Sequence, residues 1–271
     1  MPYIGNVGDN DTVDTGQLKD GAVTAAKVAA DVATQAELDL KSPLASPSFT
    51  GNVGIGTASP ARALSTKSSS VTVGSFESTS VSGGLVSFSD ANTTNDVTVR
   101  AGALGNNLVL QAGGSERMRI NADGIVTTPY QPAFNVRLSG TQSNIASSTL
   151  VTILFNDEFF DQNHDFDTST YTFTAPVTGK YKLEVMLRLN NVDASASYYY
   201  IYFHTSNRTY YSIVSSGGFA SDAAYWTMNC PVLADMDAGD AAYVQIYQAG
   251  GASQTDIAGG NDTIFLGYLV A

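Results

Sequence analysis

The sequence is poor in cysteine and in positive charge, and it contains no long hydrophobic run. Cys230 is the single cysteine among 271 residues, which excludes a framework of internal disulfide bonds. The 13 basic residues are outnumbered by 25 acidic ones, giving a formal charge of −12. This balance argues against binding to nucleic-acid phosphates or to an anionic membrane surface. No segment approaches the roughly 18 apolar residues that a membrane span requires, so membrane insertion is not expected.

The opening residues, Met1-Pro-Tyr-Ile-Gly-Asn, lack the basic and apolar regions of a secretory signal peptide. We therefore expect synthesis in a cytoplasm, with any role outside a cell requiring departure as part of a particle. Cys230 lies in the apolar stretch Trp226-Thr-Met-Asn-Cys-Pro-Val-Leu, which predicts a buried, inert thiol. A catalytic cysteine would need a histidine base, and nothing around His164 or His204 suggests a catalytic triad.

Aromatic residues are scarce in the first half of the chain. Residues 1–129 contain only Tyr3, Phe49, Phe76 and Phe88, whereas residues 130–271 contain all the others. Aromatic side chains supply much of the area buried in a globular core. The first half therefore lacks the material for a compact monomeric core. Two possibilities remain: disorder, or a thin structure that buries its few apolar residues against copies of itself.

The periodicity of the first half favours the second possibility. After Gly21 the chain is rich in helix formers, and small apolar residues recur at three- and four-residue steps: Ala25, Val28, Val32, Ala36 and Leu40. Such a narrow stripe predicts a short helical, coiled-coil stalk over residues 18–49, stopped by Pro43.

From about Thr50 the apolar period changes to two. Short strands are expected at 71–73, 85–88, 97–99, 108–110 and 118–120, separated by turns that contain Gly, Asn or Asp. Isolated hairpins are marginal in water, but hairpins from several chains can share a core. We therefore predict a β-hairpin-rich trimeric shaft over residues 50–129.

Residues 130–271 show the alternation of half-buried antiparallel strands. Within 180–190 one side is apolar, formed by Tyr181, Leu183, Val185, Leu187 and Leu189. Comparable runs lie at 134–138, 149–155, 171–173, 198–203, 210–214, 225–228, 243–247 and 264–270. Many short strands at this spacing predict a mainly β fold with a C-terminal antiparallel jelly-roll sandwich.

Several segments of the first half resemble bacteriophage tail fibres. They are Gly16-Gln-Leu-Lys-Asp-Gly-Ala-Val-Thr-Ala-Ala-Lys-Val, Ser42-Pro-Leu-Ala-Ser-Pro-Ser-Phe-Thr-Gly, Asn52-Val-Gly-Ile-Gly-Thr-Ala-Ser-Pro and Ser115-Glu-Arg-Met-Arg-Ile-Asn-Ala-Asp-Gly. The first six residues are similar to the start of fibre proteins from phages of marine bacteria, including cyanophages. The resemblance implies a trimeric shaft whose N-terminal segment, residues 1–17, attaches to a tail or baseplate protein.

The second half resembles the C1q/tumour-necrosis-factor superfamily. Pro132-Ala-Phe is similar to the opening strand, and Phe173-Thr-Ala-Pro-Val-Thr-Gly-Lys-Tyr to the most recognisable segment. Gly239-Asp240 and Phe265-Leu-Gly-Tyr-Leu are similar to the turn before the penultimate strand and to the closing strand. The resemblance implies a C1q-like jelly-roll head over residues 130–271 and a compact homotrimer. No collagen-like repeat precedes the head, so a complement-like partner does not follow.

The tyrosine run provides candidate residues for receptor binding. Tyr198, Tyr200 and Tyr202 share one face of a strand, and the residues between them share the other. One interpretation is that one face of the strand packs in the core and the other face forms a trimer interface. The alternative is that exposed rings stack on sugars. The receptor-binding candidates are Tyr199, Tyr210, Tyr211 and Trp226.

An acidic stretch, residues 156–167, contains weak candidates for metal ligation. Asp157, Asp161, Asp165 and Asp167 carry the oxygen ligands that calcium prefers, but the stretch lacks EF-hand spacing. A solvated loop is the alternative, and no metal or other cofactor is expected. Glycoside hydrolysis needs two carboxylates across a sugar bond, and the sequence places no such pair in a cleft.

The predicted function is that of a structural virion component and not of an enzyme: a homotrimeric tail fibre located in the virion. Its head is expected to bind a host-surface glycan or protein during adsorption. One alternative is a purely structural tail or baseplate appendage whose head binds another virion protein. A bacterial surface adhesin and a polysaccharide depolymerase are further alternatives.

Overall fold

The computed structural model describes residues 51–55 and 57–271, which are arranged almost wholly as β-strands. The chain divides into two compact units, with the boundary between Phe76 and Glu77. The mainly β fold class is thereby confirmed. The predicted attachment segment (1–17) and coiled-coil stalk (18–49) lie outside the described residues.

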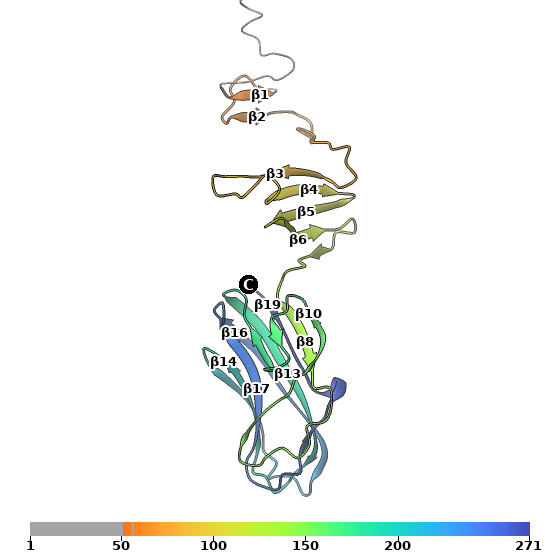
Figure 1. The fold of residues 1–271 in the computed structure, drawn as a ribbon, viewed down its shortest axis with the longest axis vertical. Coiled ribbons are helices and arrows are strands. Elements are labelled where there is room, and N and C mark those ends of the chain that lie inside the picture. The colour runs from red at the N-terminus through yellow and green to blue at the C-terminus, as the bar shows by residue number, and fades with distance from the viewer. Residues whose placement is uncertain (1–50, 56) are drawn as a thin grey trace, which may run out of the picture. The chain divides into compact units, whose positions relative to one another are not determined.

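The first unit contains one small sheet. Strands β1 (Val53–Ile55) and β2 (Leu64–Thr66) pair in parallel (Figure 1). The expected strand at Val71 to Val73 is wrong, because both valines lie outside any strand. Val71 is fully exposed and has no pairing partner, so nothing stabilises an extended ladder there.

The second unit begins with a five-stranded antiparallel sheet in simple chain order. Its strands are β3 (Gly84–Ser87), β4 (Arg100–Leu104), β5 (Asn107–Ala112), β6 (Ser115–Ile120) and β7 (Val126–Thr127). The strands expected around Leu85, Leu108 and Met118 are therefore present. The strand expected at 97–99 is wrong: the Asn95 side chain accepts hydrogen bonds from the Val97 backbone N–H and the Thr98 hydroxyl, which holds a turn in place of a strand.

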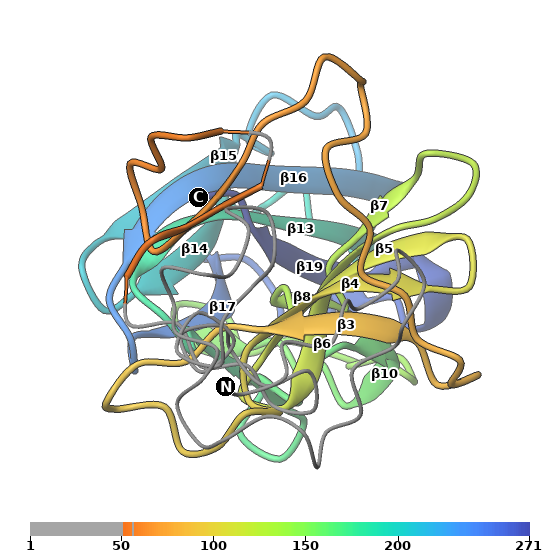
Figure 2. The same cartoon turned by 90° about the horizontal axis from the view of Figure 1, so that it is seen from above.

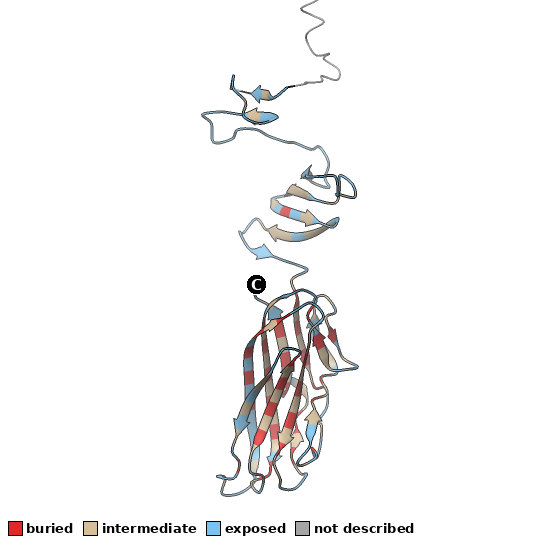
Figure 3. Cartoon of the chain, turned by 90° about the vertical axis from the view of Figure 1, so that its left-hand side faces the viewer, coloured by how far each residue is buried: buried red, intermediate tan, exposed pale blue. Residues whose placement is uncertain are grey.

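One face of this sheet is apolar and uncovered. The pairing register places these apolar side chains in two adjacent cross-strand rows: Val86, Ala101, Leu110 and Met118 in one, and Ala103, Leu108, Ile120 and Val126 in the other. Leu108 and Leu110 are 49% and 42% exposed, and Val109 is the one fully buried apolar residue of these five strands. Figure 3 shows these strands mainly in the colours of intermediate and exposed residues. We call this set of eight residues the apolar sheet face. It lacks a second layer within the described chain.

The remainder of the second unit, the head, is a sandwich of two antiparallel sheets. The first has the order β10-β8-β19-β13-β16, with β18 added to β13, and Figure 2 shows β19, β13 and β16 side by side. The second has the order β11-β12-β17-β14-β15, with β9 added to β17.

The bounds of the head strands are as follows: β8 (Ala133–Arg137), β9 (Leu150–Thr152), β10 (Asp157–Asp161), β11 (Phe166–Asp167), β12 (Thr172–Thr174), β13 (Gly179–Val192), β14 (Tyr199–Thr205), β15 (Thr209–Val214), β16 (Ala223–Met236), β17 (Ala241–Gln248), β18 (Asp256–Ile257) and β19 (Ile264–Leu269). A 3₁₀ turn, η3 (Gly260–Asp262), precedes the last strand.

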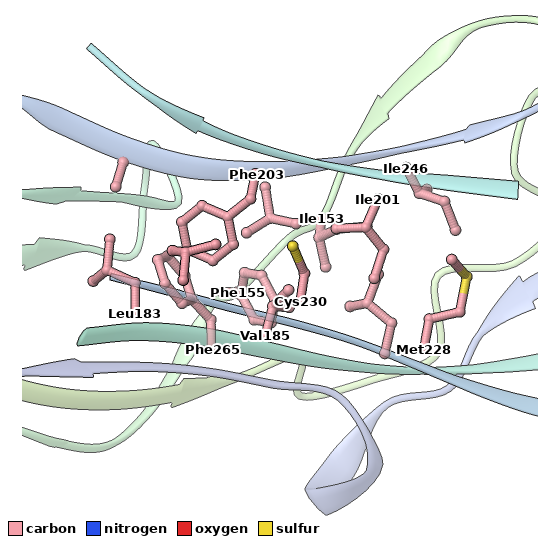
Figure 4. Close-up of a cluster of buried hydrophobic side chains, with 14 of the residues drawn as sticks. Ile153, Phe155, Leu183, Val185, Ile201, Phe203, Met228, Cys230, Ile246 and Phe265 are labelled. Carbon is pink, nitrogen blue, oxygen red and sulfur yellow. The ribbon is translucent and has the colours of Figure 1, made fainter. Parts of the chain in front are cut away.

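The core of the head follows the alternation that the sequence predicts. In β13 every second residue from Tyr181 to Leu189 has zero exposure. From the facing sheet, Ile201 and Phe203 of β14 point into the same interior as Val185 and Phe265 (Figure 4). Ring contacts reinforce this packing, since the Phe134 ring lies 4.7 Å from Phe173 and 4.9 Å from Phe265.

Three features of the head depart from the expected strands. The acidic stretch 156–167, for which a solvated loop was one interpretation, contains β10 and β11. Strand β9 covers only Leu150–Thr152 of the expected 149–155. Strand β16 extends far beyond the expected 225–228 and continues through Pro231. Proline is tolerated in this long strand because β16 is an edge strand, paired only with β13.

Replacing Gly267 by alanine tests the packing of the closing strand. A Cβ atom at Gly267 would lie 2.5 Å from Leu183 Cδ2 and 2.7 Å from Phe134 Cε1. Because Phe134 is fixed within the ring cluster, we expect Gly267→Ala to lower the free energy of unfolding of the head by about 1–3 kcal/mol, measured by chemical denaturation. Gly217→Ala is the control, since its Cβ atom would meet only Ser197 O at 3.7 Å. Equal stability of the two variants would contradict the packing described.

Candidate functional site

The outer side of the β14–β17 sheet carries a group of aromatic rings. Because Tyr199, Ile201 and Phe203 point into the core, the alternate residues of β14 point outward. The pairing register aligns them with outward residues of β15 and β17: Tyr202 lies opposite Tyr211 and Gln245, Tyr200 opposite Ile213 and Tyr247, and His204 opposite Thr209 and Tyr243. We call this surface the aromatic face, defined by Tyr198, Tyr200, Tyr202, His204, Tyr211, Tyr243 and Tyr247.

The rings of the aromatic face contact one another along the whole strand. Tyr198 and Tyr200 meet edge to face at 5.1 Å between centroids, as do Tyr202 and Tyr211. His204 stacks on Tyr243 at 4.7 Å, with an interplanar angle of 19°. These geometries are the favourable ones for aromatic pairs. Each ring of the face therefore contacts at least one other ring of the face.

The aromatic face is uncharged but not purely apolar. Burial lowers the pKa of His204 below its ordinary value of 6.5, so the imidazole is neutral at neutral pH. Burial, followed by the neighbouring hydroxyl of Tyr211, raises the pKa of Tyr202. Polar side chains lie between the rings: Gln245 Nε2 donates to Thr152 Oγ1 at 3.1 Å, and His204 Nδ1 lies 3.2 Å from Thr209 Oγ1.

The four receptor-binding candidates do not lie together. Tyr211 is 59% exposed and belongs to the aromatic face. Tyr210 lies opposite Phe203 and packs against the core from the inner side of the same sheet. Trp226 lies on β16, in the other sheet, where its ring packs against Phe219 at 5.1 Å.

Tyr199 is a core residue, and its selection as a surface candidate was wrong. The side chain has zero exposure. Its hydroxyl accepts a hydrogen bond from the Asp193 backbone N–H at 3.0 Å and lies 2.8 Å from Thr255 Oγ1. Burial raises the pKa of this hydroxyl. The ring therefore anchors the end of the sandwich and is not available to stack on a ligand.

Sequence reasoning missed most of the aromatic face as one surface. The shared side of Tyr198, Tyr200 and Tyr202 followed from the strand period alone. His204 continues that period, and this signal was present in the sequence. Tyr243 and Tyr247 join the face only through the pairing of β14 with β17, for which the sequence offered no register.

The four acidic candidates do not form a metal centre. Asp157 pairs with Arg137 at 2.6 Å, and Asp167 accepts hydrogen bonds from the backbone N–H and the hydroxyl of Ser169, which hold the pKa of its carboxyl below the usual value. Asp161 Oδ2 accepts the Phe166 backbone N–H at 2.8 Å. Across residues 51–55 and 57–271, no group of three or more His, Cys, Asp or Glu side chains could hold a metal ion.

Asp165 is held in an unfavourable environment for a charge. Burial, and then the charge of Asp161, raise the pKa of Asp165 above its ordinary 3.8. Asp161 Oδ1 and Asp165 Oδ2 are both buried without a hydrogen-bond partner. The ionised Asp165 carboxylate therefore costs free energy in the folded head.

Two other expectations concern reactivity and membranes. Cys230 is buried in the core, and burial raises the pKa of its thiol, as expected for an inert cysteine. In the part of the chain that the structure describes, no helix has the length and hydrophobicity to cross a membrane.

We expect Asp165→Asn to stabilise the head in a pH-dependent manner. Because the pKa is raised on folding, the native carboxyl costs stability as the pH rises from about 3.8 through the folded-state pKa. The variant should therefore raise Tm at pH 7 by a few degrees, and the gain should vanish as the pH is lowered toward 3.8. Thermal unfolding followed by circular dichroism measures this. Asp167→Asn is the control, since Asp167 is stabilised in its charged form and its replacement should lower Tm at pH 7. A lower Tm for Asp165→Asn at pH 7 would refute the assignment.

Comparison with known proteins identifies the family to which the head belongs. The C1q domain model matches residues 133–270. Similar solved structures include the globular domain of the zebrafish complement 1qA protein, with 20% identity, a TM-score of 0.39, and coverage of 52% of this chain and 98% of that one. A crystal structure of murine APRIL at pH 8.5 has 12% identity, a TM-score of 0.38, and coverage of 52% and 99%. A comparison with curated protein sequences finds no match.

The C1q model begins at β8 and ends after β19, so it covers the whole sandwich and about half of the chain. The C1q-like head predicted from residues such as Pro132, Phe173 and Phe265 is thereby confirmed. The chain belongs to the C1q-domain family.

Proposed function

We propose that this chain is a homotrimeric, non-enzymatic tail fibre of a bacteriophage, located in the virion, whose C1q head binds a host-surface receptor. The observation that carries the proposal is the combination of a C1q head with the apolar sheet face that precedes it in the sequence. C1q domains are generally binding modules without enzymatic activity.

The apolar sheet face supports self-association. A single-layer sheet with exposed leucines at 108 and 110 leaves apolar area in contact with water, and covering that area would be favourable. Copies of the same face can cover one another. Proteins with C1q and TNF-like heads form homotrimers, which favours three copies here as well.

The fibre-like segments support a phage tail as the location. The segment Ser115-Glu-Arg-Met-Arg-Ile-Asn-Ala-Asp-Gly forms β6 and the turn before β7. It therefore belongs to the β3–β7 sheet, which carries the apolar sheet face. Residues 1–17 would then attach the fibre to a tail or baseplate protein. In this arrangement several heads on one particle bind together, and weak single contacts become lasting adsorption.

A charge placed on the apolar sheet face should disrupt the oligomer. We expect sedimentation of the wild-type chain at micromolar concentration to give a particle mass of three times the 28.4 kDa of one chain. The double variant Leu108→Glu, Leu110→Glu should sediment as a lighter species, because three buried copies of each carboxylate repel one another and lose their hydration. Sedimentation velocity measures both.

Gln111→Glu is the matched control in the same strand. Gln111 lies on the opposite side of β5, where its side chain accepts a hydrogen bond from Arg100 Nε at 2.9 Å. This variant should retain the wild-type mass. A monomeric wild-type chain, or a trimer that is unaffected by both glutamates, would refute self-association through this face.

The receptor role predicts selective binding to cells. Fluorescently labelled full-length chain should bind a subset of marine bacterial and cyanobacterial strains, and unlabelled chain should compete with it. Flow cytometry measures the binding. Absence of binding to every strain, together with capture of the chain by another purified virion protein through its head, would favour the purely structural appendage.

A further inference from the structure

The geometry points to the aromatic face as a docking surface for an uncharged glycan. This inference rests on the proposed receptor role of the head and assigns it to one surface and one class of ligand. The outward residues from Tyr198 to His204 extend over about 20 Å of strand, which is long enough for several sugar rings.

The chemistry of the face matches that of a sugar. A pyranose presents apolar C–H groups on its faces and hydroxyl groups around its edge. The aromatic face presents ring surfaces for stacking, with tyrosine hydroxyls and the Gln245 and Thr152 side chains beside them as hydrogen-bonding groups. Tyrosine also loses little conformational entropy on binding, and here its rings already pack against one another.

The charge of the face selects a neutral ligand. The residues aligned across β15, β14, β17 and β9, from Tyr211 through Tyr202 and Gln245 to Thr152, carry no charge. Charged groups are frequent elsewhere on the head, which has 13 acidic and 5 basic residues between positions 130 and 271. The cation nearest along the chain, Arg208, is paired with Asp235 at 2.7 Å. A sulfated or sialylated glycan would find no free cation on this face.

A second copy of the chain is a poorer occupant of this surface. The rings already pack against one another within one head. The large exposed apolar side chains Tyr225, Leu233 and Tyr268 lie on the outer side of the other sheet. Self-association therefore has an alternative surface, and the aromatic face is left for a different ligand.

A glycan microarray that carries neutral, sialylated and sulfated oligosaccharides tests the inference with the full-length chain. We expect binding to neutral oligosaccharides. Tyr211→Ala and Tyr202→Ala should each weaken binding to the strongest neutral hit about three- to tenfold, measured by isothermal titration calorimetry. Tyr202→Phe retains the ring and should lose less than Tyr202→Ala. Tyr211 is 59% exposed, so its replacement leaves the fold intact.

Tyr225→Ala is the matched control, because Tyr225 is 66% exposed on the other sheet. It should leave glycan affinity unchanged. Binding restricted to anionic glycans, or an equal loss in Tyr225→Ala, would overturn the inference. A lower oligomeric mass of Tyr211→Ala would also overturn it, because the face would then lie between copies.

Chemical treatment of bound strains separates this inference from the proposed function. Periodate cleaves the vicinal diols of sugars, and protease removes surface proteins. We expect periodate, and not protease, to abolish binding of the full-length chain. Protease-sensitive, periodate-resistant binding, with no hit on the array, would leave the receptor role standing and overturn the glycan assignment. If the chain bound glycans on the array but bound no cells, the glycan assignment would stand and the receptor role would be overturned.

Discussion

The pleat of β14 is the constraint on which the head depends. Successive side chains of a strand point to opposite sides, so the burial of Tyr199, Ile201 and Phe203 fixes the outward direction of Tyr200, Tyr202 and His204. A one-residue slip in register would exchange the two sets. It would place three polar rings in the core and expose an isoleucine and a phenylalanine. Core packing and surface chemistry are therefore decided by the same choice of register.

The alternation of side chains along a strand has different consequences in the two sheets of the head and in the β3–β7 sheet. In the head, each sheet has a partner that covers its apolar side. In the β3–β7 sheet the alternation is equally regular, yet Leu108 and Leu110 meet no second layer in the described chain. The opposite side carries the fully buried Val109 together with paired polar groups, such as Arg119 and Glu116 at 2.6 Å. Regular strands alone thus leave the apolar sheet face exposed, where a second layer could pack.

The sequence predicted those features that depend on local periodicity. The apolar side of β13 was correctly predicted because Tyr181 to Leu189 alternate without interruption. The strand at 97–99 was wrong because one side chain, Asn95, competes for the backbone N–H groups that a ladder needs. The aromatic face was recognised only in part, because His204 and Tyr243 are far apart in sequence and meet through strand pairing. Tyr199 was misplaced since the strand period separates two sides without saying which one is inside.

The isolated cysteine gives the head a built-in reporter of its own opening. Cys230 is the only thiol of the chain, it is 4% exposed, and it lies on β16 in contact with the central core. A thiol reagent can reach it only when the edge strand detaches or the sandwich unfolds. The modification rate under native conditions therefore measures the free energy of that opening, in the same manner as amide hydrogen exchange. Loosening of the edge can thus be followed without any engineered label.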